Sequence, residues 1–252
     1  MHISKFAAPE ILFGRGSLHQ TGECCRRIGA NKVFIVSDEG VMAAGWVEKI
    51  IKVCQASGLA YELFYDITSN PKDYEIEKGV QRYQFSECDA VLGIGGGSAM
   101  DAAKAIAILA TNGGIIHEYE GADKIKRPLP PLLMIPTTAG SGSEVSQFSV
   151  IVDSSRKNKM TIVSKSLVPD IAITDPQTLV TKDAELTAET GMDVLTHAIE
   201  AFVSVAATPL TDVQAKNAIS LVSKHLRAST ASRTNEEAKA AMAMASLQAG
   251  LA

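Results

Sequence analysis

The chain lacks an excess of charge of either sign. Its 252 residues include 24 Lys and Arg against 28 Asp and Glu, for a net charge of −4. Aromatic residues are also scarce at 5%, and Trp46 is the single tryptophan. Proteins that bind nucleic acid need clustered positive charge for phosphates and often aromatic side chains between basic ones for stacking on bases. Neither pattern is present, so we expect no nucleic-acid partner.

Long apolar runs are also missing. No stretch of the sequence approaches the roughly 18 consecutive apolar residues that a membrane span requires. Residues 1–6 lack the apolar core of a secretory signal peptide. The sequence therefore predicts no membrane association and a cytoplasmic location.

Cysteine is rare as well, at four residues, and no pair has the Cys-x-x-Cys spacing of a structural zinc site. For a chain expected in the cytoplasm, reduced thiols are the prediction. Hydrophobic residues make up 46% of the sequence, enough for a substantial core. The four cysteines are Cys24, Cys25, Cys54 and Cys88.

What the first 180 residues do contain is an alternation of strand-like and helix-like segments. Short apolar, β-branched runs of this kind are typical of strands that are buried on both faces. Their alternation with amphipathic segments predicts a Rossmann-like, mainly parallel sheet covered by helices, an α/β fold. We predict strands at 32–38, 61–65, 90–94, 132–136, 149–153 and 171–175, and helices at 41–58, 74–85 and 99–109.

Beyond about residue 180 the sequence changes to alanine-rich segments with helical spacing. We predict three helices there, at 188–205, 212–226 and from 236 onward. The predicted organisation is therefore an α/β domain over 1–180, followed over 181–252 by the beginning of an all-α helical domain.

A glycine triplet carries the clearest chemical signal. Gly95, Gly96 and Gly97 directly follow a predicted strand and open a predicted helix, where backbone N–H groups are free to approach an anion. Ser98 and Asp101 have the spacing of a helix capping box. The segment is read either as a phosphate cradle or as a glycine-rich turn with a well-capped helix.

Two further polar sites follow other predicted strands. Residues 136–144 combine hydroxyl side chains, including Thr137, Thr138 and Ser141, with two glycines, which suits a phosphate, a ribose or an amide but also a solvated connection. Asp38 ends the first predicted strand. Its carboxylate could accept hydrogen bonds from a ribose diol and favour NAD over NADP, or it could cap the next helix.

Asp193 and His197 lie four residues apart on a predicted helix, so that they share one face. An oxygen and a nitrogen so placed could ligate one divalent metal ion, although the same spacing also gives a plain intrahelical ion pair. Apolar neighbours, Ile199 and Phe202 among them, indicate a largely buried helix. The other histidines are expected at the surface: His2, His19, His117 and His225.

Taken together, these motifs resemble the iron-containing (group III) alcohol dehydrogenase family. The family resemblance implies a dehydroquinate synthase-like architecture, with a dinucleotide-binding domain and a helical metal-binding domain on either side of the active site. The segments that carry it are 13–16, 70–71, 95–98 with Asp101, 135–144, 175–176 and 190–200.

The same resemblance implies the chemistry. It suggests reversible hydride transfer between a small primary alcohol or aldehyde and NAD, assisted by Fe²⁺ with Zn²⁺ as an alternative, in a homodimer. Asp193 and His197 correspond to the first two metal ligands. The implied cofactor-binding residues are Asp38, Asn70, Gly95, Gly96, Gly97, Ser98, Asp101, Thr137, Thr138, Ser141 and Lys159.

Members of this family continue past the position of Ala252 and carry two further histidine ligands in that continuation. The expectation is therefore a C-terminally truncated chain that binds NAD without full activity. Two other interpretations stay open: a non-catalytic nucleotide-binding or assembly module, and a related enzyme of the glycerol dehydrogenase or maleylacetate reductase type.

Overall fold

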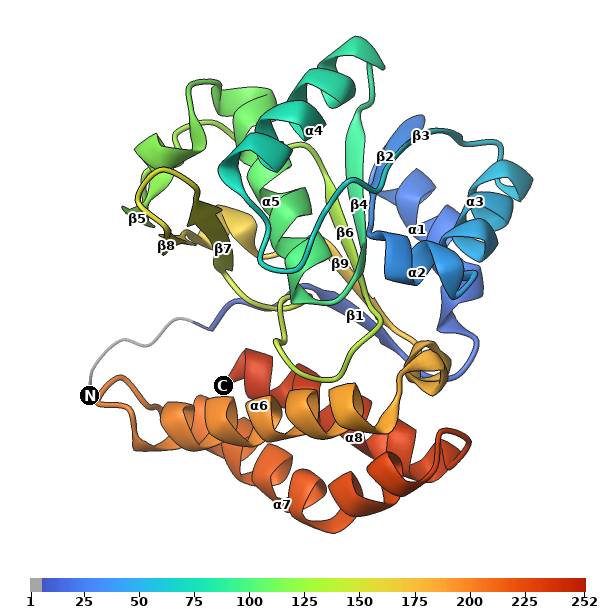
Figure 1. Ribbon diagram of the computed structural model, residues 1–252, viewed down its shortest axis with the longest axis vertical. Helices are drawn as coiled ribbons and strands as arrows, with labels where there is room; N and C mark the ends of the chain where they lie inside the picture. Colours follow the sequence, from blue (N-terminus) through green and yellow to red (C-terminus); the bar gives the residue numbers. More distant parts are fainter. Residues whose placement is uncertain (1–5) are drawn as a thin grey trace.

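A six-stranded parallel sheet forms the centre of the molecule (Figure 1). The computed structural model describes residues 6–252, and His2 lies outside them. The strand order is β1-β9-β6-β4-β2-β3, and every neighbouring pair is parallel. The predicted α/β fold with a mainly parallel sheet is confirmed. The strands are β1 Glu10–Phe13, β2 Lys32–Val36, β3 Ala60–Phe64, β4 Ala90–Gly95, β6 Leu132–Pro136 and β9 Ile171–Thr174.

Helices cover both faces of this sheet because successive side chains of its strands point to opposite sides. In β2, Phe34 and Val36 join the apolar cluster under α4 and α5, whereas Val33 and Ile35 join the cluster under α1 and α3. All four are fully buried. The covering helices are α1 Thr21–Arg27, α2 Glu39–Ala43, α3 Trp46–Ala56, α4 Asp73–Phe85 and α5 Gly97–Asn112.

A second, three-stranded sheet packs beside α5. Its hairpin consists of β7 Phe148–Asp153 and β8 Asn158–Val163, and β5 Gly121–Ala122 runs parallel to β8. Short 3₁₀ helices make further connections: η1 Ser17–Gln20, η2 Ile116–Tyr119, η3 Lys165–Leu167 and η4 Pro176–Thr181.

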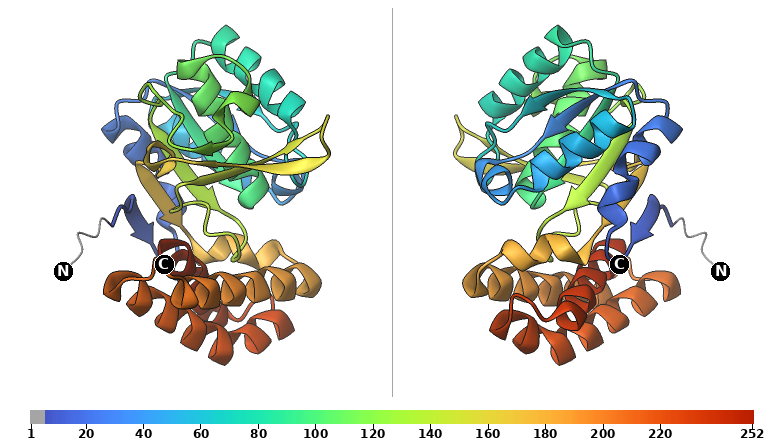
Figure 2. Two further views of the ribbon diagram at one scale, coloured as in Figure 1. Left: turned by 90° about the vertical axis from the view of Figure 1, so that its left-hand side faces the viewer. Right: turned by 90° about the vertical axis from the view of Figure 1, so that its right-hand side faces the viewer.

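Three helices form a separate layer beyond the carboxyl ends of the sheet strands (Figures 1 and 2). They are α6 Ala184–Val203, α7 Pro209–Ala231 and α8 Glu236–Leu251, and they pack on one another through small apolar residues such as Ala198, Ala218 and Ala245. Over residues 6–252, none of the helices is both long enough and apolar enough to cross a bilayer.

Several element boundaries differ from the sequence prediction. The helix predicted at 41–58 is two helices, separated at Gly45, whose φ of 78° interrupts helical geometry. Strands β1, β5 and β8 were not predicted, because β1 is a short edge strand, β5 has only two residues and β8 is half polar. The four cysteines are buried and unpaired, as predicted.

Two glycines bring the backbones of the sheet layer and the helical layer into direct contact. A Cβ built on Gly142, whose φ is +62°, would lie 2.6 Å from the Cα of Gly250 in α8. A Cβ built on Gly250 would lie 2.7 Å from the carbonyl oxygen of Gly142. The loop after β6 therefore meets α8 at a point where no side chain fits.

Gly142→Ala is expected to destabilise the protein by about 3 kcal/mol, because the methyl group must overlap the α8 backbone and the backbone conformation is left-handed. Gly29→Ala is the matched control, since Gly29 has a φ of +86° but nothing within 4 Å of an added Cβ. It should cost only about 1 kcal/mol. Urea denaturation measures both, and equal losses would contradict the contact argument.

Candidate functional site

A cleft of about 1500 Å³ runs between the carboxyl edge of the large sheet and α6. Ligands of open parallel sheets bind at this edge, where the loops that follow the strands converge. All the residues predicted for the site line the cleft, except Gly95 and Thr137. The lining residues from that set are Asp38, Asn70, Gly96, Gly97, Ser98, Asp101, Thr138, Ser141, Lys159, Asp193 and His197.

The glycine cradle forms where β4 ends and α5 begins. Gly96 is the N-cap of α5, and no side chain caps this helix, so the predicted Ser98–Asp101 capping box is wrong. The Ser98 hydroxyl instead accepts a hydrogen bond from the backbone N–H of Asn70 at 3.1 Å. A Cβ on Gly97 would lie 2.9 Å from the Ser141 hydroxyl oxygen. The cradle therefore combines an uncapped helix N-terminus with a space that only glycine leaves open.

One turn into α5, two charged residues hold the loop that follows β6. The Asp101 carboxylate accepts hydrogen bonds from the Ser143 hydroxyl at 2.6 Å and from the Val150 N–H at 3.1 Å. The fully buried Lys104 ammonium donates to the carbonyl oxygens of Ser146 and Phe148 at 2.8 and 2.9 Å. These bonds join α5 to the far wall of the cleft, and they give Asp101 a structural role.

Glu144, in the same loop, is also buried. Burial raises the pKa of the Glu144 carboxyl to about 7, against the opposing attraction of Lys104. Burial lowers the pKa of Lys104 to about 8, although Asp101 and Glu144 act to raise it. Sequence spacing did not reveal the interactions of Lys104 with Glu144, Ser146 and Phe148, because these partners lie forty or more residues away along the chain.

Of the two roles that the sequence left open for Asp38, the structure shows the helix cap. One carboxylate oxygen, Oδ1, caps α2 by accepting the Val41 N–H at 2.9 Å. The residue is half-buried and lines the cleft, and its other oxygen, Oδ2, points toward Gly95. The capping interpretation is confirmed, and the second oxygen remains available to a ligand.

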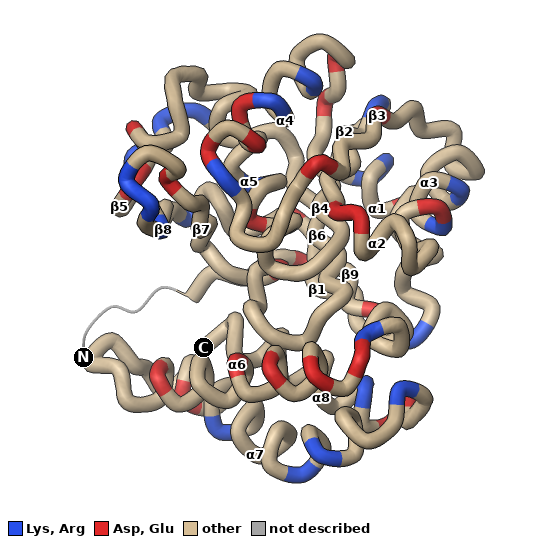
Figure 3. Tube along the Cα trace, in the orientation of Figure 1, with Lys and Arg blue, Asp and Glu red and all other residues tan. Residues whose placement is uncertain are grey.

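Asp193 and His197 share one face of α6, with Asp193 Oδ1 3.5 Å from His197 Nε2. The expectation of a largely buried helix is wrong: Asp193, Ile199 and Phe202 are exposed, since α7 and α8 cover only one side of α6. This helix carries four acidic residues and no Lys or Arg, whereas blue basic positions gather along α7 (Figure 3). The acidic face favours a cation at the cleft.

Two predicted residues lie elsewhere. Gly95 is buried at the end of β4, and its carbonyl oxygen accepts a hydrogen bond from the N–H of Thr137 at 2.8 Å. The Thr137 side chain is buried and its hydroxyl has no hydrogen-bond partner within the described residues. Both shape the floor beneath the cradle.

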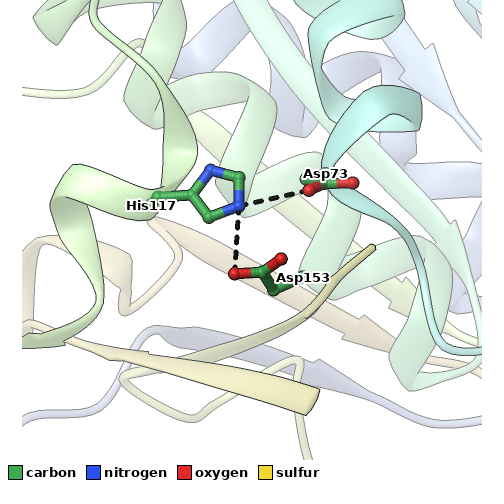
Figure 4. A group of neighbouring side chains, drawn as sticks. All are labelled: Asp73, His117 and Asp153. Carbon is green, nitrogen blue, oxygen red and sulfur yellow. Dashed lines mark ion pairs between the residues drawn. The ribbon is translucent and has the colours of Figure 1, made fainter. Parts of the chain in front are cut away.

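A second group of possible metal ligands lies outside the cleft lining: Asp73, His117 and Asp153 (Figure 4). His117 Nε2 lies 3.2 Å from Asp73 Oδ2 and 3.3 Å from Asp153 Oδ2, so His117 is not the plain surface residue that was expected. Both carboxylate oxygens already accept hydrogen bonds, from the Ser154 N–H and from Arg156. The group therefore joins the start of α4, η2 and the end of β7 as an ion-pair cluster.

Comparison with known families identifies the family of the chain. The model for "Iron-containing alcohol dehydrogenase" matches residues 8–176, and the model for "Fe-containing alcohol dehydrogenase family, C-terminal" matches residues 187–252. The chain belongs to the iron-containing alcohol dehydrogenase family. The resemblance identified from the motifs is confirmed.

Similar proteins of this family are dehydrogenases. The chain is 41% identical to the NAD-dependent methanol dehydrogenase of Bacillus methanolicus and 39% identical to the 1,3-propanediol dehydrogenase of Klebsiella pneumoniae. Each alignment covers 98% of this chain and 65% of the relative, so the chain spans slightly less than two thirds of their length.

Solved structures similar to this chain are also oxidoreductases. A 1,3-propanediol oxidoreductase superposes with a TM-score of 0.97 at 37% identity, covering 99% of this chain and 66% of that one. The sulfoacetaldehyde reductase of Bifidobacterium kashiwanohense, solved in complex with NAD⁺, superposes with a TM-score of 0.91 at 33% identity. The match covers 100% of this chain and 67% of that one. The chain is therefore similar to oxidoreductases throughout its length.

The raised pKa of Glu144 predicts a pH-dependent stability. The folded protein holds the Glu144 proton up to about pH 7, whereas the unfolded chain releases it near 4.5. The resulting stabilisation is complete below pH 4.5 and is lost as the pH rises through 7, by up to about 3 kcal/mol. Glu144→Gln should lack this loss. Urea titrations between pH 4.5 and 8 measure the difference.

Glu77→Gln serves as the control, because Glu77 is exposed on α4. Its stability curve should run parallel to that of the unmodified protein. A Glu144→Gln curve that also runs parallel would show that the Glu144 carboxyl titrates alike in the folded and unfolded states.

Proposed function

We propose that this protein is an NAD-dependent alcohol dehydrogenase of the iron-dependent type, which transfers hydride reversibly between a small primary alcohol or aldehyde and nicotinamide. The observation that carries the proposal is that the glycine cradle and the Asp193–His197 pair line one continuous cleft. A dinucleotide on the cradle would thus share its space with a metal-bound substrate.

The proposed NAD-binding domain covers residues 1–180. Backbone N–H groups at the start of α5 suit the pyrophosphate, and the hydroxyls of Thr138 and Ser141 border the same space. Asn70 and Lys159 line the cleft as well. Asp101 supports this proposal indirectly, since it fixes the loop that carries Ser141 and Ser143.

The proposed metal-binding layer covers residues 181–252. The 3.5 Å between Asp193 Oδ1 and His197 Nε2 is close to the ~3.4 Å that separates two ligands of one tetrahedral ion at ~2.1 Å, so the donor pair fits Fe²⁺ or Zn²⁺. When bound, such an ion would polarise the alcohol or carbonyl oxygen, while NAD would exchange the hydride. Asp193 and His197 would hold the ion at the end of the cleft where the substrate oxygen binds. The cradle would orient the nicotinamide toward that end.

A small substrate is supported by the names of the relatives, which act on methanol and 1,3-propanediol. We further propose a cytoplasmic homodimer. Large apolar side chains, among them Val203, Leu210 and Val213, are exposed around the α6–α7 connection and could pack against a second copy.

Binding tests the proposal without requiring turnover. The chain should bind NADH, and His197→Ala should weaken binding of Fe²⁺ at least tenfold under anaerobic calorimetry, because half of the ligand pair is lost. His225→Ala on α7, outside the cleft, is the matched control and should leave Fe²⁺ binding unchanged. Equal Fe²⁺ affinity in His197→Ala would contradict the metal assignment.

Turnover separates the dehydrogenase from the non-catalytic nucleotide-binding module. Oxidation of short primary alcohols by NAD with added Fe²⁺ supports the dehydrogenase. Tight NADH binding without turnover under the same conditions supports the nucleotide-binding module. A chain that binds neither NADH nor Fe²⁺ would contradict both.

A further inference from the structure

Lys182 is a positively charged residue at the edge of the cleft. It lies between η4 and α6, it is half-buried, and it lines the cleft. Within residues 6–252 its ammonium makes no hydrogen bond and no ion pair. Charged groups removed from water are usually paired with an opposite charge or hydrogen-bonded. A cation held in this way at the border of a binding cleft points to an anionic ligand.

The contacts around Lys182 indicate where in the cleft an anionic ligand would bind. The indole N–H of Trp46 donates to the hydroxyl of Thr181 at 3.1 Å, which ties the segment before Lys182 to the start of α3. Burial lowers the pKa of Lys182, whereas the negative charges of Asp38 and Asp183 act to raise it. Lys182 and Asp38 thus line the same cleft, and the charge of Asp38 acts on Lys182.

Two other charged residues near Lys182, Asp183 and Lys239, already have hydrogen-bond partners in the protein. The Asp183 carboxylate caps α6 by accepting the Leu186 N–H at 2.8 Å. Behind Lys182 is a cavity of only about 10 Å³, about the space of one water molecule, which Lys239 also lines. The Lys239 ammonium donates to the Ser229 carbonyl oxygen at 2.9 Å. An anion in the cleft would reach Lys182 directly, because Lys182 lines it.

The order of the strands indicates which anion this is. The cradle for the pyrophosphate follows β4, and Asp38 follows the neighbouring strand β2, the usual place for a group that contacts the adenosine ribose. Asp38 Oδ2 is free to accept a ribose hydroxyl, and alone it would repel a phosphate there. Lys182 lines the same cleft, and its positive charge would offset that of Asp38.

We propose that Lys182 is a specificity-determining residue, which lets the adenosine end of the cleft accept a 2′-phosphate, so that the protein binds NADP beside NAD. The proposal rests on the proposed dinucleotide-binding function. Asp38 and the exposed Glu39, both on the cleft wall, still favour the unphosphorylated ribose. The expected result is therefore acceptance of both cofactors rather than a preference for NADP.

The test compares 2′,5′-ADP with 5′-AMP, which differ only in the 2′-phosphate. Trp46, the single tryptophan, provides the fluorescence readout because it is bonded to Thr181 beside Lys182. The unmodified protein should bind the two probes within about tenfold of each other. Lys182→Met should weaken 2′,5′-ADP at least tenfold and change 5′-AMP less than about twofold.

Two variants strengthen the test. Lys52→Met removes an exposed lysine of α3 outside the cleft and should leave both affinities unchanged. Asp38→Asn keeps an oxygen for the α2 cap but removes the charge, so 2′,5′-ADP should bind more tightly. Adding Lys182→Met to that variant should reverse the gain.

Two results would overturn the inference in different ways. If Lys182→Met weakened both probes equally, Lys182 would serve the 5′-phosphate, and the inference would fail while the proposed dinucleotide binding stood. If the unmodified protein bound neither NADH nor 5′-AMP, the proposed function would fail together with the inference.

Discussion

The cleft depends on two charged residues of α5, Asp101 and the fully buried Lys104. Asp101 and Lys104 extend from α5, the helix whose first turn forms the cradle, and bind backbone and hydroxyl groups between Ser143 and Val150. Because charges are costly to bury without partners, these bonds strongly favour one arrangement of the loop. One helix therefore supplies the anion-binding N–H groups and also fixes the wall opposite them.

The large sheet and the helix positions were largely predictable from the sequence. Strands such as 32–36 and 90–95 are apolar on both faces, which is a strong local signal in a parallel sheet. The edge strand β1 and the half-polar strand β8 lack this signal, since their pairing is decided by β9 and β7. The break at Gly45 also depends on a backbone angle that spacing alone does not reveal.

The sequence motifs identified most of the residues that line the cleft, but they did not always predict the hydrogen-bond partners of these residues. Ser98 and Asp101 have capping-box spacing, yet their bonds go to Asn70, Ser143 and Val150 from other parts of the chain. His117 was expected at the surface because both of its carboxylate partners are distant in the sequence. Lys182 carries no motif, and its environment emerges only when η4 packs beside Trp46.

The contact between Gly142 and Gly250 links the mobility of two parts of the molecule. Main chain meets main chain there, so no side chain can change its rotamer to absorb a relative displacement. A rotation of the helical layer, which would carry Asp193 and His197 with it, must also displace the loop that holds Ser141. The opening of the cleft and the shape of its nucleotide wall are therefore mechanically coupled.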